Sequence, residues 1–489
     1  MSDARLSSEF ADVVEIRVES LAPDEVGKFL RAVRCDKPLL ITYRPAQQGG
    51  GREIGLEQRI RFWNEIDQTP LDIRQLWFDQ EGDLAGLVRK QDNTVSIRSF
   101  HDFKGVPANI DSILDTLATD GDVVKIAVTA KDITDAIPVW KLLDRAKVEK
   151  KQLIPVAMGE AGKWTRILGL AHGAFLTYAS LDAGKETADG QLTAKELIET
   201  YRVKELDKNT LVYGIIGDPV SKSLSPAMLN PAFASAGINA VYLHLQVTDL
   251  DAFMRQMVMP QTREVELNFA GFSVTMPHKE SIIKYLDEVD PIAEKIGAVN
   301  TVKIEDGKLS GYNTDVHGFI TPLKAKFGEL RDARVAVFGA GGAARACVYA
   351  LKKENANVTI VARNEQRARV MADRFGVGSV GMSKIKDQRS KVSDLFDIII
   401  DATPLGMAGA MENESLFTAD QLAGVKFVYD LVTKSVDTPI ICEAKKAGIP
   451  CLDGLEMLIA QGAKQFEIWT GREAPADVMR NSLISRNEA

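Results

Sequence analysis

The sequence predicts an α/β protein built in two halves. Short apolar runs alternate with longer amphipathic stretches along nearly all 489 residues, and this alternation is typical of parallel sheets covered by helices. A polar stretch, YRVKELDKNT, is followed directly by a new strand-like run in LVYGIIG. The second half also contains a glycine-rich turn between an apolar strand and a helix pattern. We therefore expect two to four domains, with the first boundary near residue 207.

Seven strand-like runs occur in the first half. They are VVEIRV (13–18), PLLITYR (38–44), LDIRQLWF (71–78), VSIRSFHDF (95–103), VVKIAVTA (123–130), LIPVAMG (153–159) and FLTYASL (175–181). This many strand-helix units suggest a closed (β/α) barrel, which needs eight strands.

One lysine is out of place in the fifth run. Val124, Ile126 and Val128 share one side of the strand and suit a helix layer, so Lys125 should point into the barrel. Burial of an ammonium group is costly unless the group is paired, or unless its pKa falls and it becomes a neutral nucleophile.

The second half carries a dinucleotide-binding pattern. Gly339, Gly341 and Ala344 form G-x-G-x-x-A between an apolar strand and a helix, as in a Rossmann unit. The second strand of this unit ends in VARNEQRAR, without the carboxylate that would hold a ribose 2′-hydroxyl. Arg363 and Arg367 suit a 2′-phosphate instead, so we expect NADP as the cofactor. The alternative is that these arginines only decorate an exposed helix start.

Composition restricts the partners and the location. The chain is 45% hydrophobic and 26% charged, as in ordinary globular proteins, and its net charge of −8 argues against nucleic acid or an anionic membrane as the main partner. Four cysteines and five histidines are scattered, which predicts reduced thiols and no metal site. No apolar run approaches the roughly 18 residues of a membrane span, and the N-terminal residues lack an apolar signal core. We expect a cytoplasmic enzyme of small metabolites, and we infer no obligatory protein partner.

Four polar motifs precede the glycine-rich turn: SKSLSP, GFSVTMPHKE, GAVNT and GYNTDVHGF. Each alone fits a helix start or a turn. Together with DGLEMLIAQGAKQFEIWTG near the end, they resemble the shikimate dehydrogenases over residues 211–480. The resemblance implies a substrate-binding domain at 208–316, completed by helices at 453–489, and a Rossmann NADP-binding domain at 317–452.

The same resemblance implies site residues. Lys279 and Asp315 would form the catalytic pair, since a lysine ordered by a carboxylate can deliver the proton that reduction of a ketone requires. The implied substrate contacts are Ser223, Ser225, Thr275, Asn300 and Gln461. The implied cofactor positions are Gly339, Gly341, Gly342, Ala343, Ala362, Arg363, Asn364, Arg367, Thr403, Leu431 and Gly454. Ser273 replaces a common Asn and Thr433 a usual Tyr, which leaves the preference for shikimate or quinate open.

The first half, residues 1–207, resembles type I 3-dehydroquinate dehydratases through SFHDF and VVKIAV. The order of the halves resembles the bifunctional dehydratase/dehydrogenases of plants. The resemblance implies that Lys125 forms a Schiff base with a substrate ketone and that His101 moves protons during loss of water. The implied substrate contacts are Glu15, Arg17, Arg44, Arg166, Thr187 and Gln191.

Three features depart from the dehydratase pattern. Gln48 replaces the acidic partner of the catalytic histidine, Arg74 stands where an acidic residue is usual, and the usual first strand is absent. The leading hypothesis is a shikimate-pathway enzyme that dehydrates 3-dehydroquinate to 3-dehydroshikimate and reduces that product with NADPH to shikimate. In a second hypothesis, the barrel is a weak or inactive module attached to an active dehydrogenase. A third is a quinate dehydrogenase.

Overall fold

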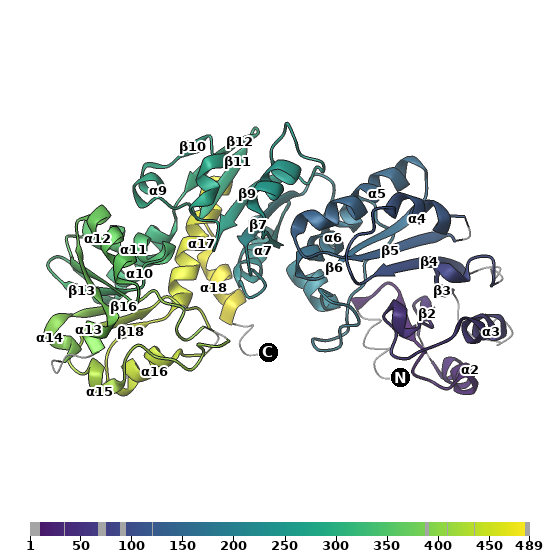
Figure 1. The fold of residues 1–489 in the computed structure, drawn as a ribbon, viewed down its shortest axis with the longest axis horizontal. Coiled ribbons are helices and arrows are strands. Elements are labelled where there is room, and N and C mark those ends of the chain that lie inside the picture. Colours follow the sequence, from purple (N-terminus) through teal and green to yellow (C-terminus); the bar gives the residue numbers. More distant parts are fainter. Residues whose placement is uncertain are drawn as a thin grey trace. The chain divides into compact units, whose positions relative to one another are not determined.

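The computed structural model describes residues 10–33, 35–66, 75–88, 94–119, 121–386, 391–407, 409–434 and 436–484 (Figure 1). The chain divides into two compact units, Met1–Lys222 with Asn239–Phe269 and Ser223–Ile238 with Ala270–Ala489. Three six-stranded sheets form within the described residues. The predicted α/β class is confirmed.

The first sheet is entirely parallel, and its strands follow one another in sequence order, as they do in a (β/α) barrel. Its strands are β1 (Val14–Arg17), β2 (Leu39–Thr42), β3 (Leu76–Glu81), β4 (Val95–Asp102), β5 (Val123–Thr129) and β6 (Gln152–Met158). The α-helices of this region are α2 (Pro23–Ala32), α3 (Leu56–Ile66), α4 (Ile110–Leu117), α5 (Ile137–Val148) and α6 (Lys163–Leu168). Short 3-10 and π turns complete it at η1 (Ala46–Gln48), η2 (Gly82–Leu84), η3 (Ile133–Ala136), η4 (Glu160–Gly162), η5 (Leu170–His172) and η6 (Glu196–Thr200).

Alternate side chains along these strands pack in two different apolar clusters. Leu39 and Ile41 of β2 pack in the cluster that contains Trp63 of α3. Leu40, between them, packs on the other face with Ile97 of β4. Since successive side chains of a strand point to opposite faces, the sheet separates a helix-covered side from an inner side.

The predicted seventh strand, 175–181, does not form. Phe175 N donates to Leu153 O of the neighbouring segment, but Ser180 then pairs with residues 192–194 through a single bridge. Phe175 thus bonds to β6, but the backbone of Ser180 pairs with the following segment. Within the described residues the sheet stays open, with β1 at one edge and β6 at the other. The predicted strand at 71–78 is also shifted, since β3 is Leu76–Glu81, and Arg74 lies outside the described residues.

The second sheet is mixed, with strand order β10-β12-β11-β9-β7-β8. The strand β11 is antiparallel to both of its neighbours. The strands are β7 (Leu211–Gly217), β8 (Ala240–Gln246), β9 (Phe269–Val274), β10 (Glu288–Val289), β11 (Thr301–Glu305) and β12 (Lys308–Tyr312). The helical segments of this region are α7 (Ser225–Ser235), α8 (Leu250–Phe253), η7 (Met254–Val258), η8 (Ser281–Tyr285) and α9 (Pro291–Ile296). Two C-terminal helices, α17 (Gly454–Thr470) and α18 (Ala476–Ile484), pack against α7.

The third sheet is parallel with order β15-β14-β13-β16-β17-β18, which is the 3-2-1-4-5-6 order of a Rossmann fold. Its strands are β13 (Arg334–Phe338), β14 (Asn357–Ala362), β15 (Gly378–Gly381), β16 (Ile398–Asp401), β17 (Phe427–Asp430) and β18 (Cys451–Leu452). Apolar side chains of α10 (Asp315–Phe327), α11 (Gly342–Lys353) and α12 (Glu365–Phe375) pack in one cluster. A second cluster contains side chains of α13 (Met382–Lys386), α14 (Val392–Leu395), α15 (Ala419–Leu422) and α16 (Pro439–Lys446).

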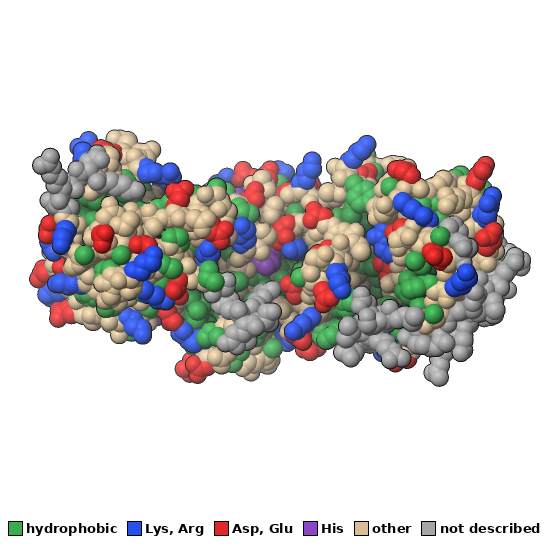
Figure 2. All heavy atoms as spheres, turned by 90° about the horizontal axis from the view of Figure 1, so that it is seen from below, with side chains coloured by type: hydrophobic (Ala, Val, Ile, Leu, Met, Phe, Trp, Pro, Cys, Tyr) green, Lys and Arg blue, Asp and Glu red, His purple; other side chains and the backbone are tan. Residues whose placement is uncertain are grey.

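Basic and acidic side chains alternate over the face drawn in Figure 2, so its described residues form no broad patch of one charge. Among the helices of the described residues, none has the length and apolarity that a membrane span requires.

Candidate active sites

Lys125 is buried on the inner side of the first sheet. Its neighbours at alternate positions of β5, Val123 and Ala127, both belong to the inner cluster. Its Nζ atom lies 3.0 Å from Asp79 Oδ2 and 4.1 Å from the ring centre of Tyr178. The predicted inward orientation is confirmed. Burial, followed by the positive charge of Arg44, lowers the pKa of the Lys125 amine, which favours the uncharged form that can act as a nucleophile.

Two buried carboxylates next to Lys125 were missed by the sequence analysis. Asp79 and Glu81 lie on β3, and Arg44 donates to both, at 2.6 Å to Asp79 Oδ2 and 3.2 Å to Glu81 Oε1. Burial disfavours ionised Asp79, but the charges of Arg44 and Lys125 outweigh it and hold the pKa of Asp79 well below its usual range. For Glu81, burial prevails and raises the pKa to about 7. The signal was the D-x-E spacing in WFDQEG, which puts both carboxylates on one face of a strand.

His101 lies on β4, and its partner is the amide of Gln48. The distance from Nδ1 to Gln48 Oε1 is 3.3 Å. Burial, with the charges of Arg44 and Lys125, keeps the pKa of His101 well below its ordinary value. The imidazole is therefore neutral near pH 7 and able to accept a proton.

Glu15 and Arg17 follow each other on one face of β1. The Thr42 hydroxyl donates to Glu15 Oε1 at 2.6 Å. Arg17 Nη2 donates to Gly49 O at 2.7 Å, directly after Gln48. The structure thus joins β1 to the loop that carries the partner of His101.

The three remaining predicted residues of this half lie after β6. Arg166, on α6, is 3% exposed, and its burial lowers the pKa to about 10. Gln191 Oε1 accepts from both the backbone N and the hydroxyl of Thr187, at 2.8 and 3.2 Å. Asp189 O of the same loop accepts from Gly159 N. The bond from Gly159 thus ties the loop to the carboxyl end of β6.

A second ionic site lies at the start of α10. Lys279 Nζ is 2.6 Å from Asp315 Oδ2, and Asn300 Nδ2 donates to Asp315 Oδ1 at 2.7 Å. Lys279 follows β9, Asn300 precedes β11, and Asp315 is the first residue of α10. The fold brings together three residues from three motifs, and both oxygens of Asp315 are bound.

Gln465 of α17 was missed and lies behind this cluster. Its Nε2 donates to Asn300 O at 3.2 Å, and its Oε1 accepts from Ser273 Oγ at 2.9 Å. Gln461, one helical turn earlier, is 3.5 Å from the Thr314 hydroxyl. Ser273 is therefore a buried support for Gln465. The i, i+4 spacing of the two glutamines was the available signal.

The other predicted substrate contacts lie near chain segments that follow strands. Ser223 Oγ donates to Ser225 Oγ at 3.2 Å at the start of α7. Thr275 and Thr433 are both half-buried, after β9 and β17 respectively.

The glycine-rich turn fits a dinucleotide. Gly339 has φ = +119°, and a Cβ there would lie 2.7 Å from Ala402 O. A Cβ at Gly341 would meet nothing within 4 Å, which leaves room for a ligand before α11. A Cβ at Gly342 would lie 3.3 Å from the Lys279 side chain. The first amides of a helix lack intrahelical partners and suit a phosphate group. The first turn of α11, which includes Ala343 and Ala344, therefore suits a phosphate, and this turn adjoins the Lys279–Asp315 pair.

The end of β14 suits a 2′-phosphate. After Ala362, Arg363 and Arg367 are exposed, and Asn364 Oδ1 accepts from Arg367 N at 2.9 Å to cap α12. The adjacent carboxylate, Glu365, would contact any Cβ at Gly381, so it turns toward β15.

The last predicted cofactor positions follow β16, β17 and β18. The Thr403 hydroxyl donates to Asp401 Oδ1 at 2.7 Å, and Leu431 N donates to Asp401 O at 2.9 Å. A Cβ at Gly454 would lie 2.5 Å from Leu431 O. These positions share the carboxyl edge of the sheet with the glycine-rich turn, where Rossmann folds bind ligands.

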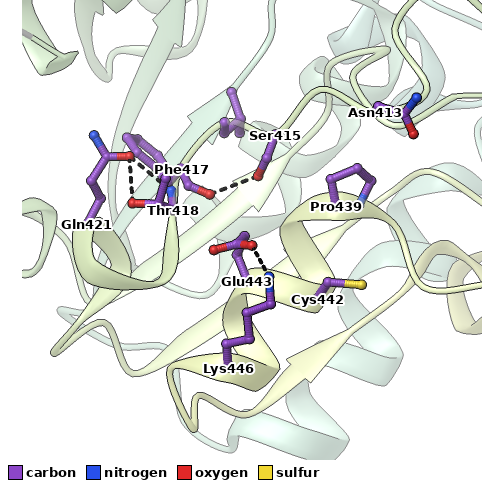
Figure 3. A pocket seen from close by; sticks show the side chains of 10 residues that line it. Asn413, Ser415, Phe417, Thr418, Gln421, Pro439, Cys442, Glu443 and Lys446 are labelled. Carbon is purple, nitrogen blue, oxygen red and sulfur yellow. Dashed lines mark hydrogen bonds and ion pairs between the residues drawn. The ribbon is translucent and has the colours of Figure 1, made fainter.

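A cavity of about 480 Å³ lies elsewhere, between the 413–421 loop and α16 (Figure 3). Ser415, Phe417, Cys442 and Glu443 are among its lining residues, and Glu443 is paired with Lys446. None of the predicted site residues lines it. Among the described residues, no cluster of three or more histidine, cysteine or acidic side chains could hold a metal ion.

Comparison with known proteins agrees with both halves. Residues 2–208 match the family model for type I 3-dehydroquinase. Residues 215–302 match the shikimate dehydrogenase substrate binding domain, 322–422 match shikimate/quinate 5-dehydrogenase, and 454–484 match the shikimate 5′-dehydrogenase C-terminal domain. The chloroplastic bifunctional 3-dehydroquinate dehydratase/shikimate dehydrogenase of Arabidopsis thaliana is 34% identical over 96% of this chain and 79% of the relative. The chain belongs to the bifunctional 3-dehydroquinate dehydratase/shikimate dehydrogenase family.

Dehydrogenase relatives match the second half of this family member alone. The NADP(+) shikimate dehydrogenase of Methanocaldococcus jannaschii is 40% identical over 58% of the chain and 99% of the relative. A shikimate dehydrogenase solved with NADP+ is 40% identical, has a TM-score of 0.52 and covers 57% of this chain and 97% of that chain. The quinate dehydrogenase of Corynebacterium glutamicum, solved with NAD, is 29% identical, with a TM-score of 0.51, over 56% and 99% of the two chains.

The residues of both lysine–carboxylate sites of the bifunctional dehydratase/dehydrogenase lie in the family matches or, for Asp315, between two of them. Lys125 and His101 fall within the dehydroquinase match, as do Asp79 and Glu81. Lys279 and Asn300 fall within the substrate-binding match of the dehydrogenase.

Proposed function

We propose that this chain catalyses two consecutive steps of the shikimate pathway. It dehydrates 3-dehydroquinate to 3-dehydroshikimate, and it reduces 3-dehydroshikimate to shikimate with NADPH. The observation that carries the proposal is the presence of two lysine–carboxylate sites, Lys125 with Asp79 and Lys279 with Asp315, in a chain whose halves match a dehydroquinase and a shikimate dehydrogenase.

In the first site, Lys125 attacks the ketone carbon of 3-dehydroquinate. The uncharged amine gives up one of its two protons, one further proton is taken up from solvent, and the ketone oxygen leaves with both as water, so that an iminium with one N–H forms. The iminium withdraws electrons from the adjacent C–H bond, and neutral His101 accepts that proton. The protonated His101 then returns its proton to the substrate hydroxyl, which leaves as water, and addition of water to the iminium releases the product and free Lys125. We assign Arg44 and Arg166, with the loop of Thr187 and Gln191, to substrate binding, because a buried guanidinium is a strong partner for a carboxylate.

In the second site, Lys279 donates a proton to the alkoxide that develops when the ketone of 3-dehydroshikimate is reduced. Asp315, held by Asn300, orients the lysine. NADPH supplies the hydride. Its phosphates would meet the amides after Gly341 and its 2′-phosphate would meet Arg363, while Ser223 and Ser225 would contact the substrate carboxylate.

Three further proposals concern the domains, the location and the partners. We propose domains at 1–207, 208–316 with 453–489, and 317–452. We also propose a cytoplasmic location, in line with four cysteines that are all free. The partners proposed are the small substrates.

One observation favours a second candidate function. Gln48 cannot stabilise a charged His101 as a carboxylate does, so an alternative is an active dehydrogenase joined to a weak or inactive barrel.

Separate assays of the purified full chain test these functions. We expect loss of water from 3-dehydroquinate without cofactor, and reduction of 3-dehydroshikimate with NADPH in strong preference to NADH. Lys125→Arg should abolish the first reaction only, because arginine keeps its charge and cannot attack a ketone, and Lys279→Ala should suppress the second only. Borohydride with 3-dehydroquinate should attach the substrate to residue 125. Water loss without this adduct would contradict the Schiff-base mechanism, and absence of both would leave the alternative function.

A further inference from the structure

Tyr178 lies against Lys125 although no sequence motif pointed to it. The ring centre is 4.1 Å from Lys125 Nζ. The hydroxyl donates to Asp79 Oδ2 at 3.4 Å. That oxygen also accepts from Lys125 Nζ at 3.0 Å and Arg44 Nη2 at 2.6 Å. Asp79 Oδ2 thus accepts hydrogen bonds from Lys125, Arg44 and Tyr178.

The segment around Tyr178 is held on both sides. The Thr177 hydroxyl donates to Arg166 O at 3.0 Å, and Ser180 N donates to Leu192 O at 2.9 Å. Phe175 and Tyr178 of this segment both pack against the inner cluster. The position of the ring is therefore set by bonds that do not depend on Lys125.

The ring matters because the nitrogen of Lys125 changes charge during the reaction. It attacks as an uncharged amine and becomes a cation again in the iminium. The face of an aromatic ring attracts a cation in a desolvated site. The ring of Tyr178 stabilises this nitrogen whenever it is charged, and so favours the iminium, the species that acidifies the neighbouring C–H bond, over the uncharged adduct that precedes it.

The Tyr178 hydroxyl acts on Asp79, the carboxylate partner of Lys125. Asp79 stays ionised only because cations face it, and it attracts the ammonium form of Lys125. A third donor on Oδ2 weakens that attraction, since the same lone pairs are shared, and so favours release of the amine for attack. The charged and titratable groups facing Lys125 are Asp79, Arg44, Glu15, Tyr178 and His101.

We propose that Tyr178 is a positioning residue of the dehydratase site: its ring stabilises the cationic nitrogen of Lys125, and its hydroxyl shares Asp79 with the lysine. This inference rests on the proposed Schiff-base function and deepens it.

The test compares Tyr178→Leu, Tyr178→Phe and the control Phe175→Leu in the full chain. Phe175 contacts the same inner cluster, but its ring lies against Trp77 at 5.4 Å. The measurements are the fraction of chain trapped at residue 125 by borohydride with saturating 3-dehydroquinate, kcat and KM for dehydration, and kcat/KM against pH.

For Tyr178→Leu we expect about a tenfold fall in kcat and a clear fall in the trapped fraction, with KM changed less than threefold. Phe175→Leu should leave the trapped fraction unchanged. In Tyr178→Phe the ring remains, so trapping should persist. In the profile of kcat/KM against pH for Tyr178→Phe, the limb that reports deprotonation of Lys125 should move to higher pH by about half a unit, because Asp79 then holds the ammonium group of Lys125 more strongly.

Thermal melting followed by circular dichroism reports folding of the dehydratase half in every variant, and Tyr178→Phe keeps the test valid if Tyr178→Leu does not fold. An unmoved pH limb in Tyr178→Phe, or trapping in a folded Tyr178→Leu equal to that of the parent, would overturn the inference. Absence of any adduct in the parent would instead overturn the Schiff-base function itself, so the two failures are distinguishable.

Discussion

At the scale of single residues, the hydrogen bond between Gln48 and His101 decides how the dehydratase site handles protons. The amide orients the imidazole at 3.3 Å but carries no charge. Burial, followed by the positive charges of Arg44 and Lys125, depresses the pKa of His101. The neutral imidazole of His101 can thus accept a proton, but Gln48 gives its protonated form no stabilisation by charge.

Gln48→Glu should raise the dehydration rate several-fold near pH 7, because a carboxylate stabilises the imidazolium that forms when the proton is taken up. The pKa of His101 should rise, so activity should fall off at a higher pH on the acid side than in the parent. Rate against pH, measured with 3-dehydroquinate alone, checks both effects.

Gln47→Glu is the matched control, since Gln47 is exposed and bonded to Glu53 rather than to His101. An equal gain in both variants would show that the added charge acts at long range and not through His101.

At the scale of elements, adjacent strands β16 and β17 end in two buried carboxyls. Asp401 and Asp430 are register partners. Burial, followed by the neighbouring Asp430, raises the pKa of Asp401 to about 7, and burial raises that of Asp430 to about 6. Asp401 nonetheless accepts the bonds of Thr403 that shape the loop after β16. The strand ends thus order the expected cofactor loops with groups that resist ionisation.

Asp401→Asn should change how stability depends on pH. A carboxyl whose folded pKa is raised binds more protons in the folded state, so the parent loses stability as pH rises from about 4 to about 7. An amide keeps the acceptor oxygen and removes this loss. The variant should therefore melt at a higher temperature than the parent at pH 8 and at a similar temperature near pH 4. At about 1.4 kcal/mol per pKa unit, the difference can reach a few kcal/mol.

Asp397→Asn, at the other end of β16, provides a control of opposite sign. Its carboxylate is paired with Arg334, which lowers its pKa, so this variant should lose stability at neutral pH and recover parity in acid. If the melting temperatures of both variants changed in the same direction at neutral pH, the raised pKa assigned to Asp401 and the lowered pKa assigned to Asp397 would be contradicted.

At the scale of the whole molecule, the two sites share no residue. The residues around Lys125 belong to the first compact unit, and Lys279, Asp315 and the glycine-rich turn belong to the second. Each site should therefore work when the other is disabled.

Lys125→Arg and Lys279→Ala should each block the overall conversion of 3-dehydroquinate and NADPH to shikimate. An equal mixture of the two proteins should restore it after a lag, because 3-dehydroshikimate released by one protein reaches the other. NADPH oxidation followed by absorbance checks this. A mixture that stays silent, while each variant performs its remaining half-reaction, would contradict free release of the intermediate.

The sequence by itself determined the features whose information is local. The Rossmann unit was predictable because a strand, a glycine turn and a helix are consecutive and their spacing has steric causes. The inward direction of Lys125 followed from the two-residue period of a strand. The Lys279–Asp315 pair was found through the family resemblance of its motifs.

The tertiary structure decided what depends on pairing between distant segments. Asp79 and Glu81 were missed because the expected strand, 71–78, ended before both residues, whereas β3 extends to Glu81 through its pairing with β2 and β4. The pattern of residues 175–181 predicts a strand, but Ser180 pairs with residues 192–194 instead. Tyr178 consequently meets Lys125, a contact across 53 positions that no local pattern encodes. The pKa shifts are of the same kind, since burial and neighbouring charge exist only once the chain has folded.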